Sequence, residues 1–185
     1  MSTAIYVRLD STHSHLRHRA ILSPWYRIES RAQCGRNIGD TVMTVASILR
    51  QKGAQVATIS PDADIKSAAD WLYAKNIGAL VVVSSDAILG IISERDIVHA
   101  FSRYGDAVGS LPVQNIMTQN LITAVPEDDL NHVMRLMTRH RVRHMSVIQN
   151  RKLAGIISIG DVVKRRLDDM ELEANVLRDA YIAKP

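Results

Sequence analysis

The sequence predicts an α/β (α+β) fold of two pseudo-symmetric repeats, each a small β-sheet with two packed helices. Three observations predict it. Short runs of β-branched residues alternate with segments whose apolar residues recur at helical spacing. The pattern of residues 56–101 returns without a gap in residues 121–166. Apolar residues make up 46% of the chain and aromatic residues only 4%, so the core must be built from aliphatic side chains.

The hydrophobic periods define the elements of the first repeat in order. Val45, Ile48 and Leu49 share one helix face, and Gly53 ends that helix. The elements that follow are a strand over Val56–Ile59 ended by Ser60-Pro61, a helix carrying Ile65, Ala68, Ala69 and Leu72, a strand over Ala79–Val83, a turn over residues 84–86, a returning strand over Ile88–Ile92 and a helix from Glu94 to about Tyr104.

A shift of 65 residues places the second repeat on the first. The heptapeptide GIISERD at residues 90–96 returns as GIISIGD at residues 155–161. The lead-in helix returns too, at a shift of 68, with Val113, Ile116 and Met117 as its apolar residues. A unit of about 60 residues is marginal alone. We therefore expect the repeats to pack sheet to sheet in one domain, with ligand clefts between them.

The chain divides into four segments. Residues 1–42 show no sustained period and carry +3 of the net charge of +4, so we expect a disordered or dispensable N-terminal arm, or sequence upstream of the true start. Its His13-x-His15 pair lacks the further ligands that a metal site needs. The other segments are the first repeat over 43–107, the second over 108–168 and a C-terminal helical extension over 169–185.

Composition and motifs exclude several classes of protein. No run approaches the roughly 18–20 apolar residues of a membrane span, and no secretory signal is evident. The single Cys34 fits a reducing compartment, so we expect a cytoplasmic protein. Beyond the arm the charge is nearly balanced, which argues against a nucleic-acid partner and leaves DNA-linked regulation resting on the arm alone. No nucleophile beside a base and no metal-ligand set appears, so we predict no enzyme, no catalytic residue and no metal.

The repeated Ser and Asp of the heptapeptides have two interpretations. Ser93 and Asp96 form an S-x-x-D pattern at a helix start, which is typical of a capping box. Alternatively, the carboxylate accepts hydrogen bonds from both ribose hydroxyls of a nucleotide, and the helix N-terminus and Arg95 suit its phosphate. Ser158 and Asp161 repeat the pattern.

The double unit resembles a pair of cystathionine β-synthase (CBS) domains, the Bateman module, over Met43 to about Asp168. The stretches that carry the resemblance are VATISPDADI, IGALVVV, GIISERDIV, LITAVPEDDL, RHMSV and GIISIGDVVKRRL. The run TRHRVRH at 138–144 is similar to that of short stand-alone bacterial CBS-pair proteins, although Ser146 stands where they usually have Pro. The resemblance implies an adenosyl ligand: AMP, ADP, ATP or NAD(H), with S-adenosylmethionine less favoured.

The resemblance also implies which residues bind. Asp96 and Asp161 would hold the ribose, with Ser93 and Ser158 beside them. Residues next to the first strand of each repeat would touch the base or ribose: Thr58, Ile59, Ser60, Thr123, Ala124 and Val125. Arg143 and His144 would contact phosphate, whereas we assign Arg139 and Arg141 to the solvated end of a helix. Glu94-Arg95 in one repeat and Arg143-His144 in the other differ in position, so we expect two unequal sites.

The sequence therefore predicts an adenine-nucleotide sensor that regulates an unidentified effector protein. We expect a homodimer closed through two helical faces, one carrying Ile97, Val98 and Phe101 and the other Val162, Val163 and Leu167. The alternative is a ligand-free dimerisation scaffold.

Overall fold

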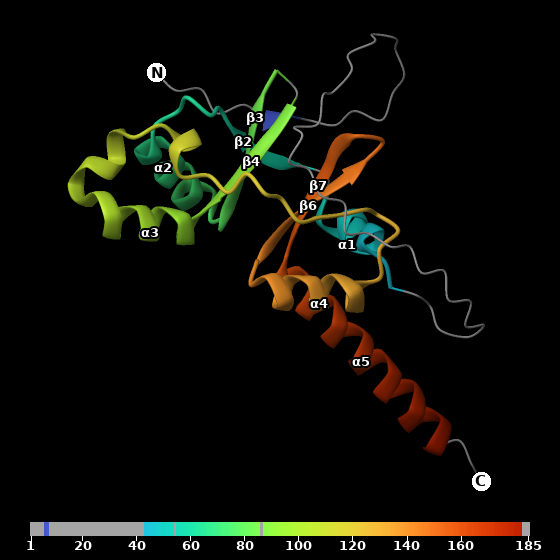
Figure 1. Ribbon diagram of the computed structural model, residues 1–185. Helices are drawn as coiled ribbons and strands as arrows, with labels where there is room; N and C mark the ends of the chain where they lie inside the picture. Colours follow the sequence, from blue (N-terminus) through green and yellow to red (C-terminus); the bar gives the residue numbers. More distant parts are fainter. Residues whose placement is uncertain (1–5, 8–42, 54, 86, 183–185) are drawn as a thin grey trace.

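The computed structural model describes residues 6–7, 43–53, 55–85 and 87–182 (Figure 1). Both repeats have the predicted order of strand, helix, strand, strand, helix. The elements are β1 (Tyr6–Val7), α1 (Val45–Lys52), β2 (Val56–Ile59), α2 (Ile65–Lys75), β3 (Ala79–Ser84), β4 (Ala87–Ser93), α3 (Glu94–Tyr104), the 3-10 helices η1 (Gly105–Ser110) and η2 (Val113–Asn115), β5 (Thr123–Ala124), α4 (Leu130–His140), β6 (His144–Gln149), β7 (Lys152–Ser158) and α5 (Ile159–Ile182). The predicted α/β fold of two repeats is confirmed.

Most of the N-terminal arm, including His13 and His15, lies outside the described residues, as does Asp86 of the predicted turn. Tyr6–Val7 of the arm forms β1, which pairs antiparallel with β2. That the arm is dispensable stays a prediction.

The two sheets have the same internal arrangement. In the first, β2 is parallel to β3 and β3 is antiparallel to β4; in the second, β5, β6 and β7 repeat this order. Both antiparallel pairs shift register at the equivalent place, between Val82 and Val83 and between Val147 and Ile148. Such a bulge increases the local twist of the strand. In each repeat the last strand delivers its Ser to the start of a helix.

The lead-in segments are exchanged between the repeats. α1 is the lead-in of the first repeat, but Val45 and Ile48 lie in the aliphatic core of the second, and Figure 1 shows α1 beside β6 and β7. Val113 belongs to the lead-in of the second repeat and is buried in the core of the first. The docking bonds are equivalent: Val45 N donates to Asp128 O at 3.0 Å, and Val113 N to Ala63 O at 2.8 Å. Neither core is complete without the other repeat's lead-in.

The lead-in to the second repeat differs from our prediction. An α-helix through Val113, Ile116 and Met117 is wrong, because helical structure there is limited to the three residues of η2. The chain leaves the helical path because Thr118 exchanges two backbone hydrogen bonds with Ile91 of β4, at 2.8 and 3.0 Å.

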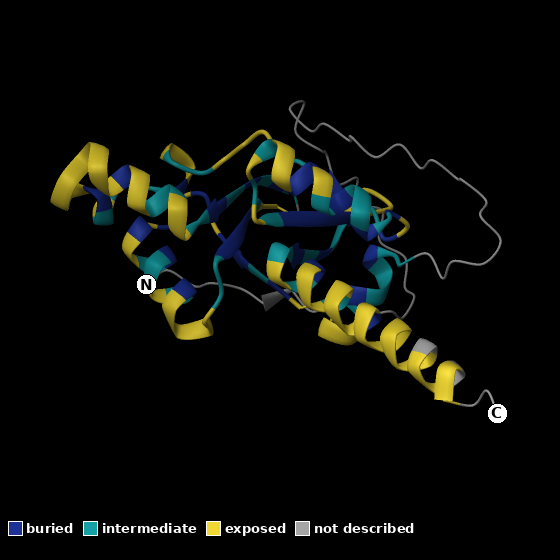
Figure 2. Cartoon of the chain, turned by 90° about the horizontal axis from the view of Figure 1, so that it is seen from below, coloured by how far each residue is buried: buried dark blue, intermediate teal, exposed yellow. Residues whose placement is uncertain are grey.

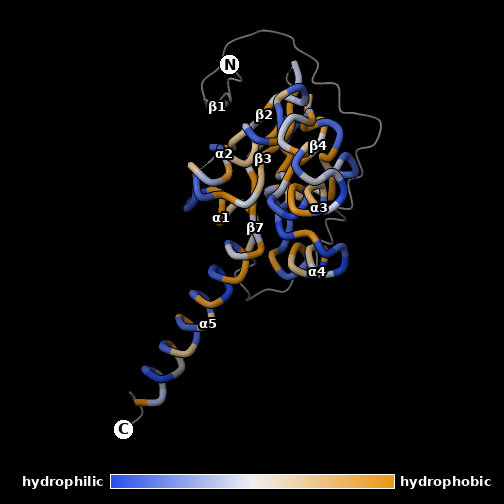
Figure 3. Tube along the Cα trace, turned by 90° about the vertical axis from the view of Figure 1, so that its left-hand side faces the viewer, coloured by the Kyte–Doolittle hydropathy of each residue, from blue (hydrophilic) through white to orange (hydrophobic). Residues whose placement is uncertain are grey.

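The two sheets meet face to face through a third apolar cluster, as expected. Its buried members are Val56, Val81, Ile88, Leu121 and Ile148. Figure 2 shows the buried residues gathered along the strands, with exposed residues on the outer sides of the helices. The long helix α5 leaves this body and continues past it (Figures 1 and 3).

Two residues assigned to the dimer face pack against the cores. Ile97 is partly buried against the core of the first repeat. Val162 is 1% exposed and packs inside the core of the second repeat, so its inclusion in the dimer face is wrong. Val98, Phe101, Val163 and Leu167 are exposed, as that prediction requires.

Candidate functional site

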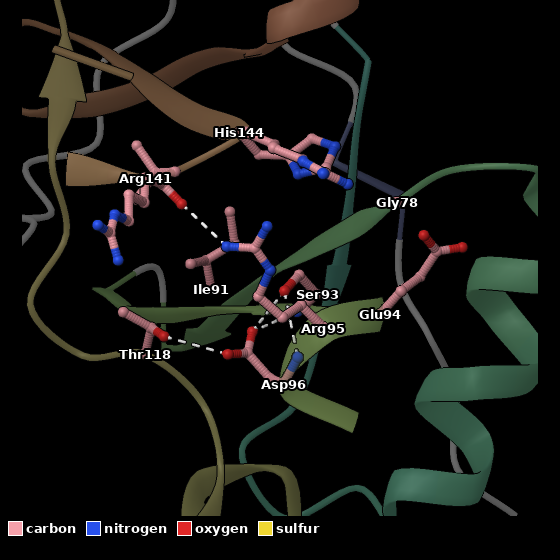
Figure 4. A pocket seen from close by; sticks show the side chains of 11 residues that line it. Gly78, Ile91, Ser93, Glu94, Arg95, Asp96, Thr118, Arg141 and His144 are labelled. Atoms are coloured by element: carbon pink, nitrogen blue, oxygen red, sulfur yellow. Dashed lines mark hydrogen bonds between the residues drawn. The ribbon is translucent and has the colours of Figure 1, made fainter. Parts of the chain in front are cut away.

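A pocket of about 210 Å³ is lined by residues of both repeats (Figure 4). The first repeat contributes the start of α3 and the strand before it, and the second contributes the turn between α4 and β6. The lining residues are Gly78, Ile91, Ser93, Glu94, Arg95, Asp96, Thr118, Arg141, Val142, Arg143 and His144.

Asp96 forms the predicted capping box and also lines the pocket. Its Oδ2 accepts hydrogen bonds from Ser93 N at 2.8 Å and Ser93 Oγ at 2.6 Å, so the capping box is formed. Its Oδ1 lies 3.5 Å from Thr118 Oγ1, a weak bond that a closer ligand hydroxyl could replace (Figure 4). Capping therefore uses one carboxylate oxygen and leaves the other for the pocket.

Arg95 connects the two repeats across the pocket. Its Nη1 donates to the backbone carbonyl of Arg141 at 3.0 Å (Figure 4). Arg141 is the left-handed C-cap of α4, with a φ of 55°, so this bond satisfies a carbonyl at the helix end. A guanidinium has five N–H groups, which leaves Arg95 donors for an anion in the pocket.

His144 fills the space over Gly78. A Cβ atom at Gly78 would lie 2.8 Å from His144 Cε1, so a larger residue there would displace the imidazole. Burial and the nearby Lys52 lower the pKa of His144 from its ordinary value of 6.5. Glu94 and Asp161 act in the opposite direction, but the net change is a lower pKa. His144 is consequently neutral at neutral pH. The pair Gly78-Ala79 is small where the second repeat has Arg143-His144, and this difference makes room for the larger pair.

Asp161 has a different environment from Asp96. Its Oδ2 accepts hydrogen bonds from Ser158 N at 2.7 Å and Ser158 Oγ at 2.8 Å, and also forms an ion pair with Lys52 Nζ at 2.7 Å. Burial raises the pKa of Asp161, but the bonds from Lys52 and Ser158 outweigh it, and the pKa lies below its ordinary value. The two repeated carboxylates are therefore unequal, because α1 supplies a cation to only one of them.

The predicted strand residues lie outside this pocket. Thr58, Ile59, Thr123 and Ala124 are buried, Val125 is partly buried and Ser60 is exposed. The pocket thus brings together Ser93, Arg95, Asp96, Arg143 and His144, and it does not include the six strand residues, Ser158 or Asp161.

Six lining residues were not among the predicted binding residues: Gly78, Ile91, Glu94, Thr118, Arg141 and Val142. Of these, Arg141 was assigned to the solvated end of a helix. Ile91 and Thr118 meet only because the lead-ins are exchanged, and no local pattern signals that contact. Arg141 is exposed at the end of α4, but its carbonyl lies within reach of Arg95. No group of three or more His, Cys, Asp or Glu suited to a metal occurs in the part of the chain that the structure describes. Among the same residues, no helix is long and apolar enough to cross a membrane.

Comparison with known proteins gives a consistent result. The CBS domain family matches residues 45–103 and 113–168. The CBS domain-containing protein CBSX3, mitochondrial, of Arabidopsis thaliana is 31% identical over 188 residues, which cover 91% of this chain and 90% of that protein.

Two solved structures agree. A CBS-domain containing protein of Agrobacterium tumefaciens is 42% identical, with a TM-score of 0.66 over 67% of this chain and 99% of that one. A candidate signal-transduction protein with CBS domains from Burkholderia ambifaria is 36% identical, with a TM-score of 0.66 over 69% of this chain and 96% of that one.

Proposed function

Because the chain belongs to the CBS-domain family, we propose that it is a regulatory protein that binds an adenine nucleotide in the pocket at Asp96. The Burkholderia relative, with its candidate role in signal transduction, supports a regulatory role. We propose no catalytic activity and no catalytic cofactor; the Arabidopsis and Agrobacterium relatives are named for their CBS domains and not for a reaction.

The observation that carries the proposal is the juxtaposition of unlike groups across one pocket. Asp96 presents a carboxylate oxygen at the start of α3. Arg95, Arg143 and His144 line the same pocket, the last two from the other repeat. A carboxylate suits a ribose diol, while forked guanidinium donors and a helix N-terminus suit phosphate.

The cationic groups favour a phosphate-bearing ligand. We propose AMP, ADP, ATP or NAD(H), and S-adenosylmethionine is less favoured because its positive sulfonium would face these cations. A ligand held by residues of both repeats would stabilise their mutual arrangement, and that change is what an unidentified effector protein would sense.

The second repeated carboxylate supports an unequal second site. Asp161 already has Lys52 as its partner, so a ligand there must compete with an ion pair formed within the chain. We propose that the Asp96 pocket binds more tightly.

A calorimetric titration of two variants tests the proposal, after a thermal-shift screen has chosen among AMP, ADP, ATP, NAD, NADH and S-adenosylmethionine. Asp96→Asn keeps the shape of the cap but removes the charge, so affinity should fall about ten- to hundred-fold. Asp64→Asn is the matched control, because Asp64 caps α2 through Ser67 N at 2.6 Å and is absent from the pocket lining. Equal affinity in wild type and Asp96→Asn would reject the ribose role.

The second candidate function is a ligand-free dimerisation scaffold. One observation favours it: Asp96 and Asp161 each form a complete capping arrangement without a ligand. Absence of a thermal shift with every ligand of the screen would select the scaffold.

We also propose a cytoplasmic location, on the single Cys34. The Arabidopsis relative is mitochondrial by name, and fractionation of the source cells distinguishes the two compartments.

A further inference from the structure

The C-terminal part of α5 has an apolar surface and little to pack against. The helix has 24 residues, and every described side chain from Met170 onward is exposed. Leu167 and Met170 are 54% and 55% exposed, and Tyr181 is 81% exposed. The part over residues 170–182 is short enough, by the limit of about 12–15 residues, that it would be marginal as a solitary helix in water. The apolar residues of α5 alternate with charged ones where the helix leaves the body (Figure 3).

The apolar residues of α5 follow the alternating four-three spacing of a heptad repeat. Successive apolar positions are separated by four, three, four, three and four residues, so that positions two steps apart differ by seven: Val163, Leu167, Met170, Ala174, Leu177 and Tyr181. In heptad notation Leu167, Ala174 and Tyr181 occupy position a, and Val163, Met170 and Leu177 position d. This spacing keeps one stripe facing a partner helix over about three heptads.

The charges beside the stripe select a parallel partner of identical sequence. In a parallel pair, position g of one helix meets position e of the next heptad of the other. Arg166 then faces the second copy's Glu171, and Glu173 faces its Arg178, so both contacts join opposite charges. In an antiparallel pair e meets e, and centring the stripe places Glu171 against Glu171 and Lys164 against Arg178.

We propose that residues 163–182 form a parallel two-stranded coiled coil with a second copy of this chain. This inference is independent of the proposed nucleotide. A lipid surface is a poorer occupant, because residues 164–182 carry four basic and five acidic side chains and lack the positive excess that anionic membranes attract. Leu172 and Val176 are exposed too, but occupy positions f and c, outside the stripe.

Disulfide trapping tests the parallel arrangement. In a Cys34→Ser background of the full chain, Met170→Cys and Tyr181→Cys are made separately and oxidised mildly. A parallel pair brings each position against itself, so both variants should give covalent dimers. Asp179→Cys, at position f, is the control that should not. In an antiparallel pair only a residue at the twofold axis lies against its own copy, so at most one of the two variants could form a disulfide. Covalent dimers from only one variant, or from neither, would overturn the proposal.

Charge reversal tests the partner contacts. Glu173→Arg and Arg178→Glu should each raise the dimer dissociation constant about three- to tenfold, measured by sedimentation at low salt. The double variant restores opposite charges and should return to within about twofold of wild type. Additive weakening in the double variant, or a monomeric wild type at micromolar concentration, overturns the proposal.

A matched pair of substitutions of apolar residues by Glu distinguishes association through the stripe from non-specific hydrophobic association. Met170→Glu should dissociate the dimer, whereas Leu172→Glu, two residues away and also exposed, should not. Equal loss in both variants would overturn the coiled coil and indicate a partner of another class.

Discussion

Gly90 and Gly155 explain part of the repetition at the scale of single residues. A Cβ atom at Gly90 would lie 2.8 Å from the backbone oxygen of Thr118, and one at Gly155 would lie 2.5 Å from Leu49 Cδ2. Each glycine of the repeated heptapeptide therefore lies against the other repeat's lead-in. The two heptapeptides share a glycine because the other repeat's lead-in approaches the strand closely at that position. They share Ser and Asp because these residues cap the helix that starts there.

Gly90→Ala should destabilise the protein by about 1–3 kcal/mol, since a backbone atom cannot move aside as a flexible side chain can. Gly109→Ala, whose Cβ would find its nearest neighbour at 3.8 Å, should change stability by less than about 1 kcal/mol. Denaturant unfolding of both variants measures the difference. Equal stability of the two would show that the contact between Gly90 and Thr118 relaxes freely.

His144 should make phosphate binding depend on pH. Its pKa is lowered in the folded chain by burial and by Lys52, so its protonation opposes folding and the ligand-free protein loses stability as the pH falls below about 6.5. A bound phosphate stabilises the imidazolium, so affinity should rise from about pH 8 to about pH 6. His144→Gln should reduce this rise, as measured by calorimetry. Adenosine serves as control, because a ligand without phosphate should show no difference between the two proteins.

At the scale of elements, α1 shows that a helix can stabilise the repeat other than its own. It comes first among the helices of the described residues, yet Val45 and Ile48 complete the core of the second repeat and Lys52 forms an ion pair with Asp161. A helix beside the first repeat in sequence thus stabilises the second.

Two truncations and two substitutions test the role of α1. A chain starting at Met43 should keep nearly the melting temperature of the full chain, whereas one starting at Gly53 should lose the second core. Ile48→Ala should lower the free energy of unfolding by about 2–5 kcal/mol, because Ile48 is buried. Arg50→Ala should change it by no more than about 0.5 kcal/mol, because Arg50 is exposed. A loss of several degrees on starting at Met43 would show that the arm packs on the body, beyond the β1 pairing.

At the scale of the whole molecule, α3 adds a second apolar surface for assembly. Val98 and Phe101 are exposed on α3, and large exposed apolar residues that cluster on one element commonly mark an interface. We expect the dimer to bury this face together with the stripe of α5. Phe101→Glu should weaken the dimer at least tenfold in light scattering, whereas His99→Glu, on the same helix, should not. A fully dimeric Phe101→Glu protein would remove α3 from the interface.

The sequence by itself determined the class of fold, the twofold repeat, most element bounds and the start of each closing helix. These follow from local periods, capping residues and breakers, which act over a few residues. Only the tertiary structure decided three features. The lead-ins are exchanged between the repeats, Arg143 and His144 line the pocket of Asp96 rather than that of Asp161, and Lys52 forms an ion pair with Asp161. These contacts join residues far apart in the chain, and which of two similar surfaces a segment covers depends on how the two repeats pack, which no local spacing encodes.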